Sequence, residues 1–160
     1  MTNGRTLLWV DDDGEERFLY ERYNLERKGW TITWAFTVLE AARKLAEKSF
    51  DAVLLDQLLP PQKYEDEPSL WGGCALLYWL RGGGLLQDTR EFDFVADLNP
   101  RSNNQNIRVT LVTAFFDDQV MSYVNNAPGP AVELVKKPIA IAHLVASLEV
   151  RSVIIGGGGL

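Results

Sequence analysis

The hydrophobic positions of this sequence follow two spacings that alternate along the chain. Short apolar or alternating runs, typical of strands, occur at residues 6–10, 30–36, 52–55, 107–112 and 131–135. Apolar residues recur at helical spacing at residues 15–28, 38–48, 76–80, 117–124 and 141–150. Strands that alternate with helices in this way indicate βαβ units. We therefore predict an α/β fold, a doubly wound parallel sheet of five strands with five helices.

Two irregular stretches interrupt this pattern. Residues 61–71 carry two prolines and several charges, and residues 82–106 open with three consecutive glycines. We expect a single domain over residues 5–151, with a long insertion within 61–106. Apart from the short helix near residues 76–80, the insertion should be the most mobile part of the fold, because it has few periodic apolar positions to dock it. Residues 152–160, which include four glycines, are expected to form a flexible tail.

Composition and charge exclude several classes of function. The 160 residues are 46% hydrophobic, enough for a sizeable core, and their net charge of −6 argues against nucleic acid or an anionic membrane as a direct partner. A single cysteine and a single histidine exclude an intramolecular disulfide and a histidine-rich metal site. The four apolar residues before Asp11 are too few for a signal peptide or a membrane span. We expect a soluble, cytoplasmic domain.

Candidate chemistry lies where the predicted strands end, since ligands of such sheets bind at the carboxyl ends of the strands. The polar residues at these positions are Asp11, Asp12 and Asp13 after the first strand, Asp56 after the third, Thr113 after the fourth and Lys137 after the fifth. Converging carboxylates repel each other, and a bound Mg²⁺ would remove that repulsion. A lysine and a hydroxyl beside the metal would then bind an anionic group, which is what phosphoryl transfer requires.

Four separated pieces of sequence carry a resemblance to a known family. In order, they are LLWVDDD at residues 7–13, DAVLLDQLLP at 51–60, VTLVTA at 109–114 and VKKP at 135–138. Each covers the end of a predicted strand. From about Arg5 to Arg151 the chain resembles the receiver domain of bacterial response regulators. The resemblance implies a flavodoxin-like sheet with the strand order 2-1-3-4-5.

The resemblance also implies a role for each acidic residue of the site. Asp56 corresponds to the phosphoacceptor. Asp11 and Asp12 correspond to the acidic pair, with Asp12 as the more direct Mg²⁺ ligand and Asp11 acting through water. The backbone carbonyl of Leu58 would complete the metal ligands that the protein supplies.

Two further residues of the resemblance would bind the transferred group. Thr113 corresponds to the hydroxyl residue that turns toward the phosphoryl group, and Lys137 to the lysine that pairs with it. Family members hold the peptide bond between that lysine and the following proline, here Pro138, in the cis form.

The sequence departs from the family at three points. Leu134 stands where the family carries its switch aromatic, three residues before the lysine. Asp56 and Thr113 are 57 residues apart, about twice the usual separation. Leu58 and Phe115 are apolar where many members carry polar side chains beside the path of attacking water. This predicts slow autodephosphorylation.

Other polar or aromatic residues have simpler explanations. Asp13 is expected to begin the first helix, Lys136 to be a solvated neighbour of Lys137, and His143 to lie at the surface. Cys74 is expected to be buried as a small apolar residue. Trp71, beside a charged loop, is the best candidate for an exposed partner contact.

These observations favour a stand-alone phosphoacceptor switch rather than an enzyme. A histidine kinase or a histidine phosphotransfer protein would phosphorylate Asp56, and the output would be a contact with a downstream protein. The alternative is a pseudo-receiver, a binding module of the same fold that is never phosphorylated. A Mg²⁺-dependent phosphatase would need a second acid two residues after the nucleophile, where Leu58 stands.

Overall fold

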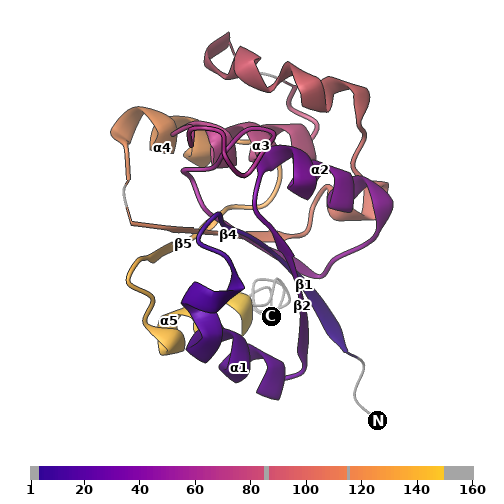
Figure 1. Cartoon of the computed structure of the whole chain (residues 1–160). Helices are drawn as coiled ribbons and strands as arrows, with labels where there is room; N and C mark the ends of the chain where they lie inside the picture. Colours follow the sequence, from indigo (N-terminus) through magenta and orange to yellow (C-terminus); the bar gives the residue numbers. More distant parts are fainter. Residues whose placement is uncertain (1–3, 85–86, 115, 150–160) are drawn as a thin grey trace, which may run out of the picture.

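A computed structural model describes residues 4–84, 87–114 and 116–149 of the chain. Five parallel strands form one sheet in the order β2-β1-β3-β4-β5 (Figure 1). Their bounds are Arg5–Val10 (β1), Trp30–Ala35 (β2), Ala52–Leu55 (β3), Arg108–Thr113 (β4) and Glu133–Lys136 (β5). The predicted fold class and strand order are therefore confirmed.

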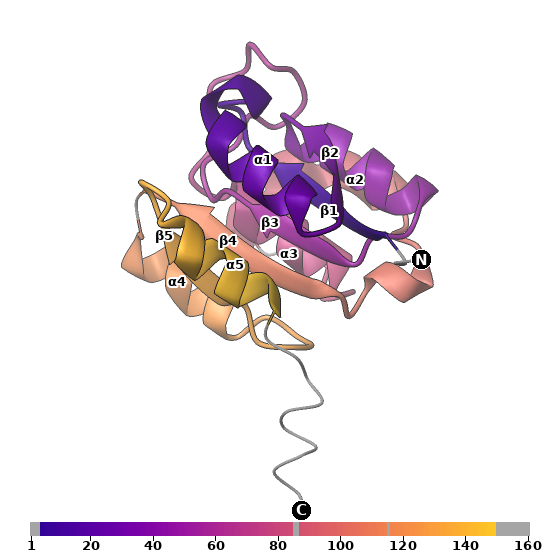
Figure 2. The ribbon, with the colours of Figure 1, turned by 90° about the horizontal axis from the view of Figure 1, so that it is seen from below.

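Helices cover both faces of this sheet. One face carries α1 (Leu19–Arg27), which follows the 3₁₀ helix η1 (Glu15–Phe18), and α5 (Ile141–Glu149). The opposite face carries α2 (Val38–Glu47), α3 (Gly72–Leu80) and α4 (Asp118–Asn125), as Figure 1 and Figure 2 show from two sides. The described residues thus form the five predicted α-helices. The insertion adds two further 3₁₀ helices, η2 (Gln87–Asp97) and η3 (Ser102–Asn104).

Strand β1 shows why a continuous apolar run builds the centre of the sheet. Leu8 and Val10 join the core beneath α2, α3 and α4, whereas Leu7 and Trp9 join the core beneath α1 and α5. All four are fully buried, because successive side chains of a strand face opposite sides and both sides are covered. The next residue, Asp11, stands at the carboxyl edge of the sheet.

Several predicted boundaries shift in the structure, and two of them have a clear local cause. Helix α3 begins at Gly72 rather than near residue 76. It can do so because Gly73 lies against the backbone of Asp56 and Gln57, where any Cβ would collide. Strand β5 begins at Glu133, two residues later than predicted. The preceding residues 126–132 form an irregular connection that contains two prolines and Gly129 with a φ of +86°.

The second part of the insertion is docked on the domain. Phe92 and Val95 of η2 are fully buried in the core. Helix η2 packs on α3 and α2, on their side away from the sheet (Figure 1). The indole N–H of Trp79 donates to the carbonyl of Leu98 at 2.9 Å. The sequence shows few periodic apolar positions in this stretch, and Phe92 and Val95 anchor it without regular spacing. Its mobility relative to the rest of the fold stays a prediction.

Helix α3 owes its burial to this cover. All nine of its residues are buried, whereas a helix on the outside of a sheet normally leaves one face in water. Asn104 of η3 ties down the far end of the insertion. Its amide donates to the carbonyls of Leu45 and Lys48, and its Oδ1 accepts from the N–H of Phe50.

Most of the simpler predictions for single residues are confirmed. Cys74 is buried, whereas Lys136 and His143 are exposed. Trp71 is half-buried and packs edge-on against Tyr123, with ring centroids 5.4 Å apart, so its role as a partner contact stays a prediction. Residues 62–68 form a loop that is mostly exposed. The predicted tail at 152–160 lies outside the described residues.

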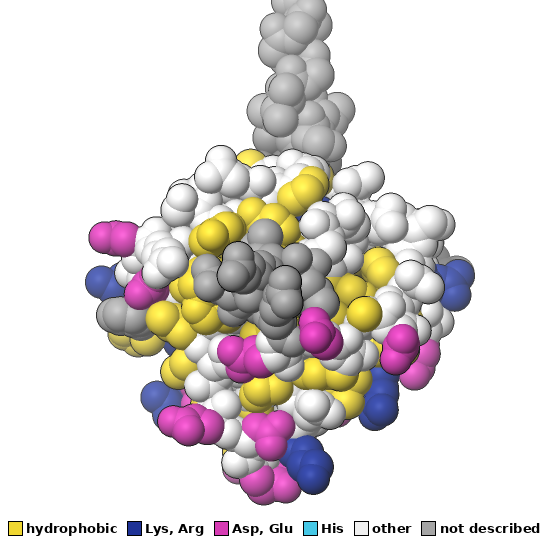
Figure 3. All heavy atoms as spheres, turned by 90° about the horizontal axis from the view of Figure 1, so that it is seen from above, with side chains coloured by type: hydrophobic (Ala, Val, Ile, Leu, Met, Phe, Trp, Pro, Cys, Tyr) yellow, Lys and Arg dark blue, Asp and Glu magenta, His cyan; other side chains and the backbone are white. Residues whose placement is uncertain are grey.

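Two further observations concern the surface. None of the helices in the described part of the chain is long and apolar enough to cross a bilayer. Figure 3 views the face formed by α2, α3, α4 and η2, where acidic side chains lie both near the centre and at the rim and the visible basic ones lie at the rim. Where this face is formed by described residues, their basic side chains form no concentrated patch for nucleic acid.

Candidate functional site

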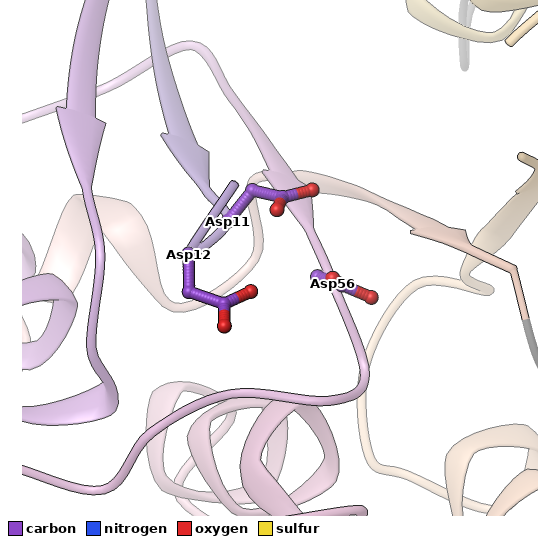
Figure 4. A group of neighbouring side chains, drawn as sticks. All are labelled: Asp11, Asp12 and Asp56. Atoms are coloured by element: carbon purple, nitrogen blue, oxygen red, sulfur yellow. The ribbon is translucent and has the colours of Figure 1, made fainter. Parts of the chain in front are cut away.

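Three carboxylates meet at the carboxyl edge of the sheet, where β1 and β3 end (Figure 4). Val10 pairs with Leu55 in these neighbouring strands, so the residues that follow, Asp11 and Asp56, come side by side. The N–H of Asp56 donates to the carbonyl of Val10 at 2.9 Å and maintains this register. One carboxylate oxygen from each of Asp11, Asp12 and Asp56 lies within 4.8 Å of the others.

Lys137 reaches this cluster from the end of β5. Its Nζ lies 2.7 Å from Oδ2 of Asp11 and 3.0 Å from Oδ2 of Asp56. A third carboxylate, that of Asp13, lies 3.4 Å away. The lysine side chain is only 14% exposed, so its ion pairs with Asp11 and Asp56 lie largely out of water, whereas Asp13 is 42% exposed. The peptide bond between Lys137 and Pro138 is cis, as the resemblance implies.

Thr113 is the last residue of β4, the strand beside β3, and it is buried. Its carbonyl accepts a hydrogen bond from the N–H of Lys137 at 2.9 Å. The structure therefore brings Thr113 to the same edge of the sheet as Asp56 and Lys137. The role of its hydroxyl stays a prediction.

Burial and charge together set the protonation of the site. Burial, with the nearby charge of Asp56, raises the pKa of Asp11 from 3.8 to about 6, although Lys137 opposes this rise. Burial also raises the pKa of Asp56, against the effect of Lys137 and of the Gln57 N–H, which donates to Asp56 Oδ1 at 2.7 Å. Burial disfavours the charge of Lys137, but the attraction of Asp56 and Asp11 is larger and raises the pKa of Lys137. The single positive charge of Lys137 therefore only partly neutralises the negative charge of the carboxylates around it.

This donor set fits a hard divalent cation. Mg²⁺ prefers oxygen ligands and is usually bound by one or two carboxylates together with waters and phosphate oxygens. Asp12 is half-buried, and its pKa is raised by burial and by the charges of Asp11 and Asp13. A cation among Asp11, Asp12 and Asp56 would remove this repulsion. The contribution of the Leu58 carbonyl to such a site stays a prediction.

Two of the three positions at which the sequence departs from the resemblance are apolar and partly open to solvent. Leu134 on β5 is 39% exposed, and Leu58, just past Asp56, is 44% exposed. Phe115 lies outside the described residues. An aromatic switch at position 134 is therefore absent from this chain.

Two contacts of Lys137 were not predicted from the sequence. Asp13 was expected to begin the first helix, and this is wrong. Gly14, with a φ of +79°, turns the chain first, so that η1 begins at Glu15 and Asp13 pairs with Lys137. Phe18 has the sequence signature of an ordinary apolar position, yet Lys137 Nζ lies over its ring, 5.4 Å from the centroid. In the sequence, the only indication of a role for Asp13 at the site is that it is the third consecutive aspartate. Nothing in the local sequence indicates that Phe18 contacts Lys137.

Known proteins resemble this chain in structure rather than in sequence. No family model matches it, and no curated protein is similar to it. A putative response regulator from Chloroflexus aurantiacus J-10-fl is 21% identical, with a TM-score of 0.64 over 92% of this chain and 96% of that one. The receiver domain of a sensor histidine kinase from Pseudomonas aeruginosa PAO1, with a magnesium ion coordinated in its active site cleft, is 18% identical with a TM-score of 0.63 over the same shares.

A third solved structure contains a modified acidic residue. It is a response regulator protein from Burkholderia pseudomallei with a phosphorylated aspartic acid, a calcium ion and citrate. It is 15% identical, with a TM-score of 0.57 over 97% of this chain and 72% of that one. What the chain shares with these structures is the fold.

Proposed function

We propose that this chain, which has the CheY-like fold of response regulator receiver domains, is a phosphoacceptor switch of a two-component phosphorelay. Asp56 accepts the phosphoryl group. The observation that carries the proposal is the position of Lys137 Nζ, which lies 3.0 Å from Asp56 and 2.7 Å from Asp11. Phosphoryl transfer requires a cationic side chain beside a cluster of carboxylates that suits Mg²⁺, and Lys137 stands in this position.

The reaction forms one bond and breaks one. A carboxylate oxygen of Asp56 attacks the phosphorus of a phosphohistidine or of acetyl phosphate, and the new P–O bond forms. The bond from phosphorus to the imidazole nitrogen or the acetate oxygen breaks, and the leaving group keeps its electron pair. Mg²⁺, when bound, neutralises charge on the phosphoryl oxygens. Lys137 pairs with the transferred group, and the hydroxyl of Thr113 donates to it.

The proposed partners follow from this chemistry. A histidine kinase or a histidine phosphotransfer protein donates the phosphoryl group, and a downstream protein binds the switched domain in the cytoplasm. Helix α1, which begins directly after Phe18, exposes large side chains that a protein partner would cover: Leu19, Tyr20 and Tyr23 are 57%, 64% and 59% exposed. A protein partner is favoured over nucleic acid by the net charge of −6.

Incubation with acetyl phosphate and Mg²⁺, followed by intact mass measurement, tests the proposal. The parent protein should gain the mass of one phosphoryl group, and Asp56→Asn should not. Asp93→Asn, which changes an exposed carboxylate in η2, is the matched control and should be modified like the parent. An unmodified parent, or equal modification of Asp56→Asn, would refute the assignment.

The alternative function, a pseudo-receiver that binds partners without being phosphorylated, has one specific observation in its favour. Leu134 cannot act as a rotating aromatic switch, and its side chain is already 39% exposed. The same mass measurement separates the two functions. A parent that binds Mg²⁺ and remains unmodified by acetyl phosphate would support the pseudo-receiver.

A further inference from the structure

The ring of Phe18 is an uncharged group that contacts the ammonium of Lys137. Lys137 Nζ lies over this ring, 5.4 Å from its centroid. This distance is within the range, up to about 6 Å, in which an aromatic face attracts a cation. Phe18 is the last residue of η1 and is 6% exposed, so little water competes for the contact.

Neighbouring aromatic rings hold Phe18 in place. It stacks on Trp9 of β1, with centroids 4.8 Å apart and an interplanar angle of 26°. Trp9 in turn stacks on Trp34 of β2 at 4.7 Å. Phe18 and Trp34 are nearly parallel, at 8° and 6.3 Å. Because Trp9 is fully buried in the central strand, the Phe18 ring has a fixed position that does not depend on the charges of the site.

The charges that hold Lys137 are less constant than this ring. The same Asp11 and Asp56 that pair with its ammonium belong to the carboxylate group that suits Mg²⁺. A divalent cation there would compete with the ammonium for both carboxylates and would repel it. The aromatic face remains available in either state, because it binds cations through its quadrupole and is not a Mg²⁺ ligand.

From this arrangement we infer that Phe18 is a positioning residue for Lys137. It keeps the ammonium beside Asp56 when Mg²⁺ occupies the carboxylates, so that the lysine is in place for the phosphoryl group. The part of the inference that concerns the phosphoryl group rests on the proposed function. The part tested first, that Phe18 holds Lys137 in place when Mg²⁺ binds, does not. The contact between lysine and ring strengthens when the metal weakens the pull of the carboxylates, and Phe18 therefore favours metal binding.

A double-mutant cycle in the full chain tests this first part. Isothermal titration calorimetry gives the Mg²⁺ dissociation constant of the parent, Phe18→Leu, Lys137→Met and the double variant. Phe18→Leu should weaken Mg²⁺ binding by about two- to tenfold in the parent, a range set by the strength of such contacts. In the Lys137→Met background it should have no effect. An equal loss in both backgrounds, or no loss in the parent, would overturn the inference.

A second variant separates electrostatics from packing. Pentafluorophenylalanine at position 18 keeps the shape of the ring but reverses its quadrupole, so it should weaken Mg²⁺ binding at least as much as leucine while the protein stays folded. Unchanged Mg²⁺ binding with this ring would also overturn the inference. Phosphorylation by acetyl phosphate should slow in the same variants. The calorimetric titration needs no phosphoryl transfer. If acetyl phosphate leaves the parent unmodified, the proposed function is refuted, but the double-mutant cycle still tests the role of Phe18 in Mg²⁺ binding.

Discussion

Replacing Asp11 by asparagine should make the metal-free protein more stable at neutral pH and change how its stability depends on pH. Asp11 is fully buried, and its pKa in the folded protein is about 6, above the ordinary value of 3.8. The folded state therefore binds this proton more tightly than the unfolded chain does. The stability that Asp11 contributes is complete below about pH 4 and is lost as the pH rises through about 6.

The size of this effect follows from the two pKa values. A rise from 3.8 to about 6 corresponds to about 3 kcal/mol of unfolding free energy, at about 1.4 kcal/mol for each pH unit. Asparagine has nearly the same shape and does not titrate. The variant loses its ion pair with Lys137, but the lysine keeps Asp56 at 3.0 Å. The difference in stability between Asp11→Asn and the parent should therefore grow by about 3 kcal/mol between about pH 4 and pH 7.

Urea unfolding in the presence of a chelator, repeated across this pH range, measures the difference. Asp93→Asn, at an exposed position, is the matched control. Saturating Mg²⁺ should reduce the advantage of Asp11→Asn, since the metal neutralises the parent's carboxylates. A difference in stability that stays constant from acid to neutral pH would show that burial of Asp11 does not control its ionisation.

Three other variants test separate parts of the structure. Asp12→Ala should abolish Mg²⁺ binding in calorimetry and leave a folded protein, because it removes both a ligand and its repulsion; unchanged affinity would exclude Asp12 as a ligand. Leu58→Asn combined with Phe115→Glu should shorten the lifetime of the phosphorylated state, measured by intact mass over time, since polar side chains can hold the attacking water in line. An equal lifetime would place the water path elsewhere. Phe92→Ala should lower the unfolding free energy by about 3–5 kcal/mol, because the ring is fully buried; a loss below about 1 kcal/mol would mean that η2 is only loosely attached.

The candidate site was predictable because its residues stand at the ends of strands. Asp11, Asp56 and Lys137 each directly follow a short strand of the parallel sheet. The carboxyl ends of such strands meet at one edge, so a sequence pattern that locates the strands also locates the site. The structure places Lys137 within ion-pair distance of Asp11 and Asp56, and the roles of these residues stay predictions.

The contacts that depend on loop conformation were not predictable in this way. The pairing of Asp13 with Lys137 requires the turn at Gly14, and the spacing of Phe18 fits a buried helix position equally well. Helix η2 was missed because Phe92 and Val95 follow no sustained helical or strand period. Each of these features is decided by packing between segments that are distant in the sequence.

The complete burial of α3 restricts how this chain could be shortened. Asp56 and Thr113 are 57 residues apart in this chain, about twice the separation expected for a receiver. This length suggests deleting residues 85–100. Such a deletion would remove Phe92 and Val95 and uncover Trp79 and its neighbours on a helix that has no polar face. Apolar surface of that kind promotes self-association in water. The trimmed protein would aggregate, and a soluble short form would need polar residues on the outer side of α3 as well.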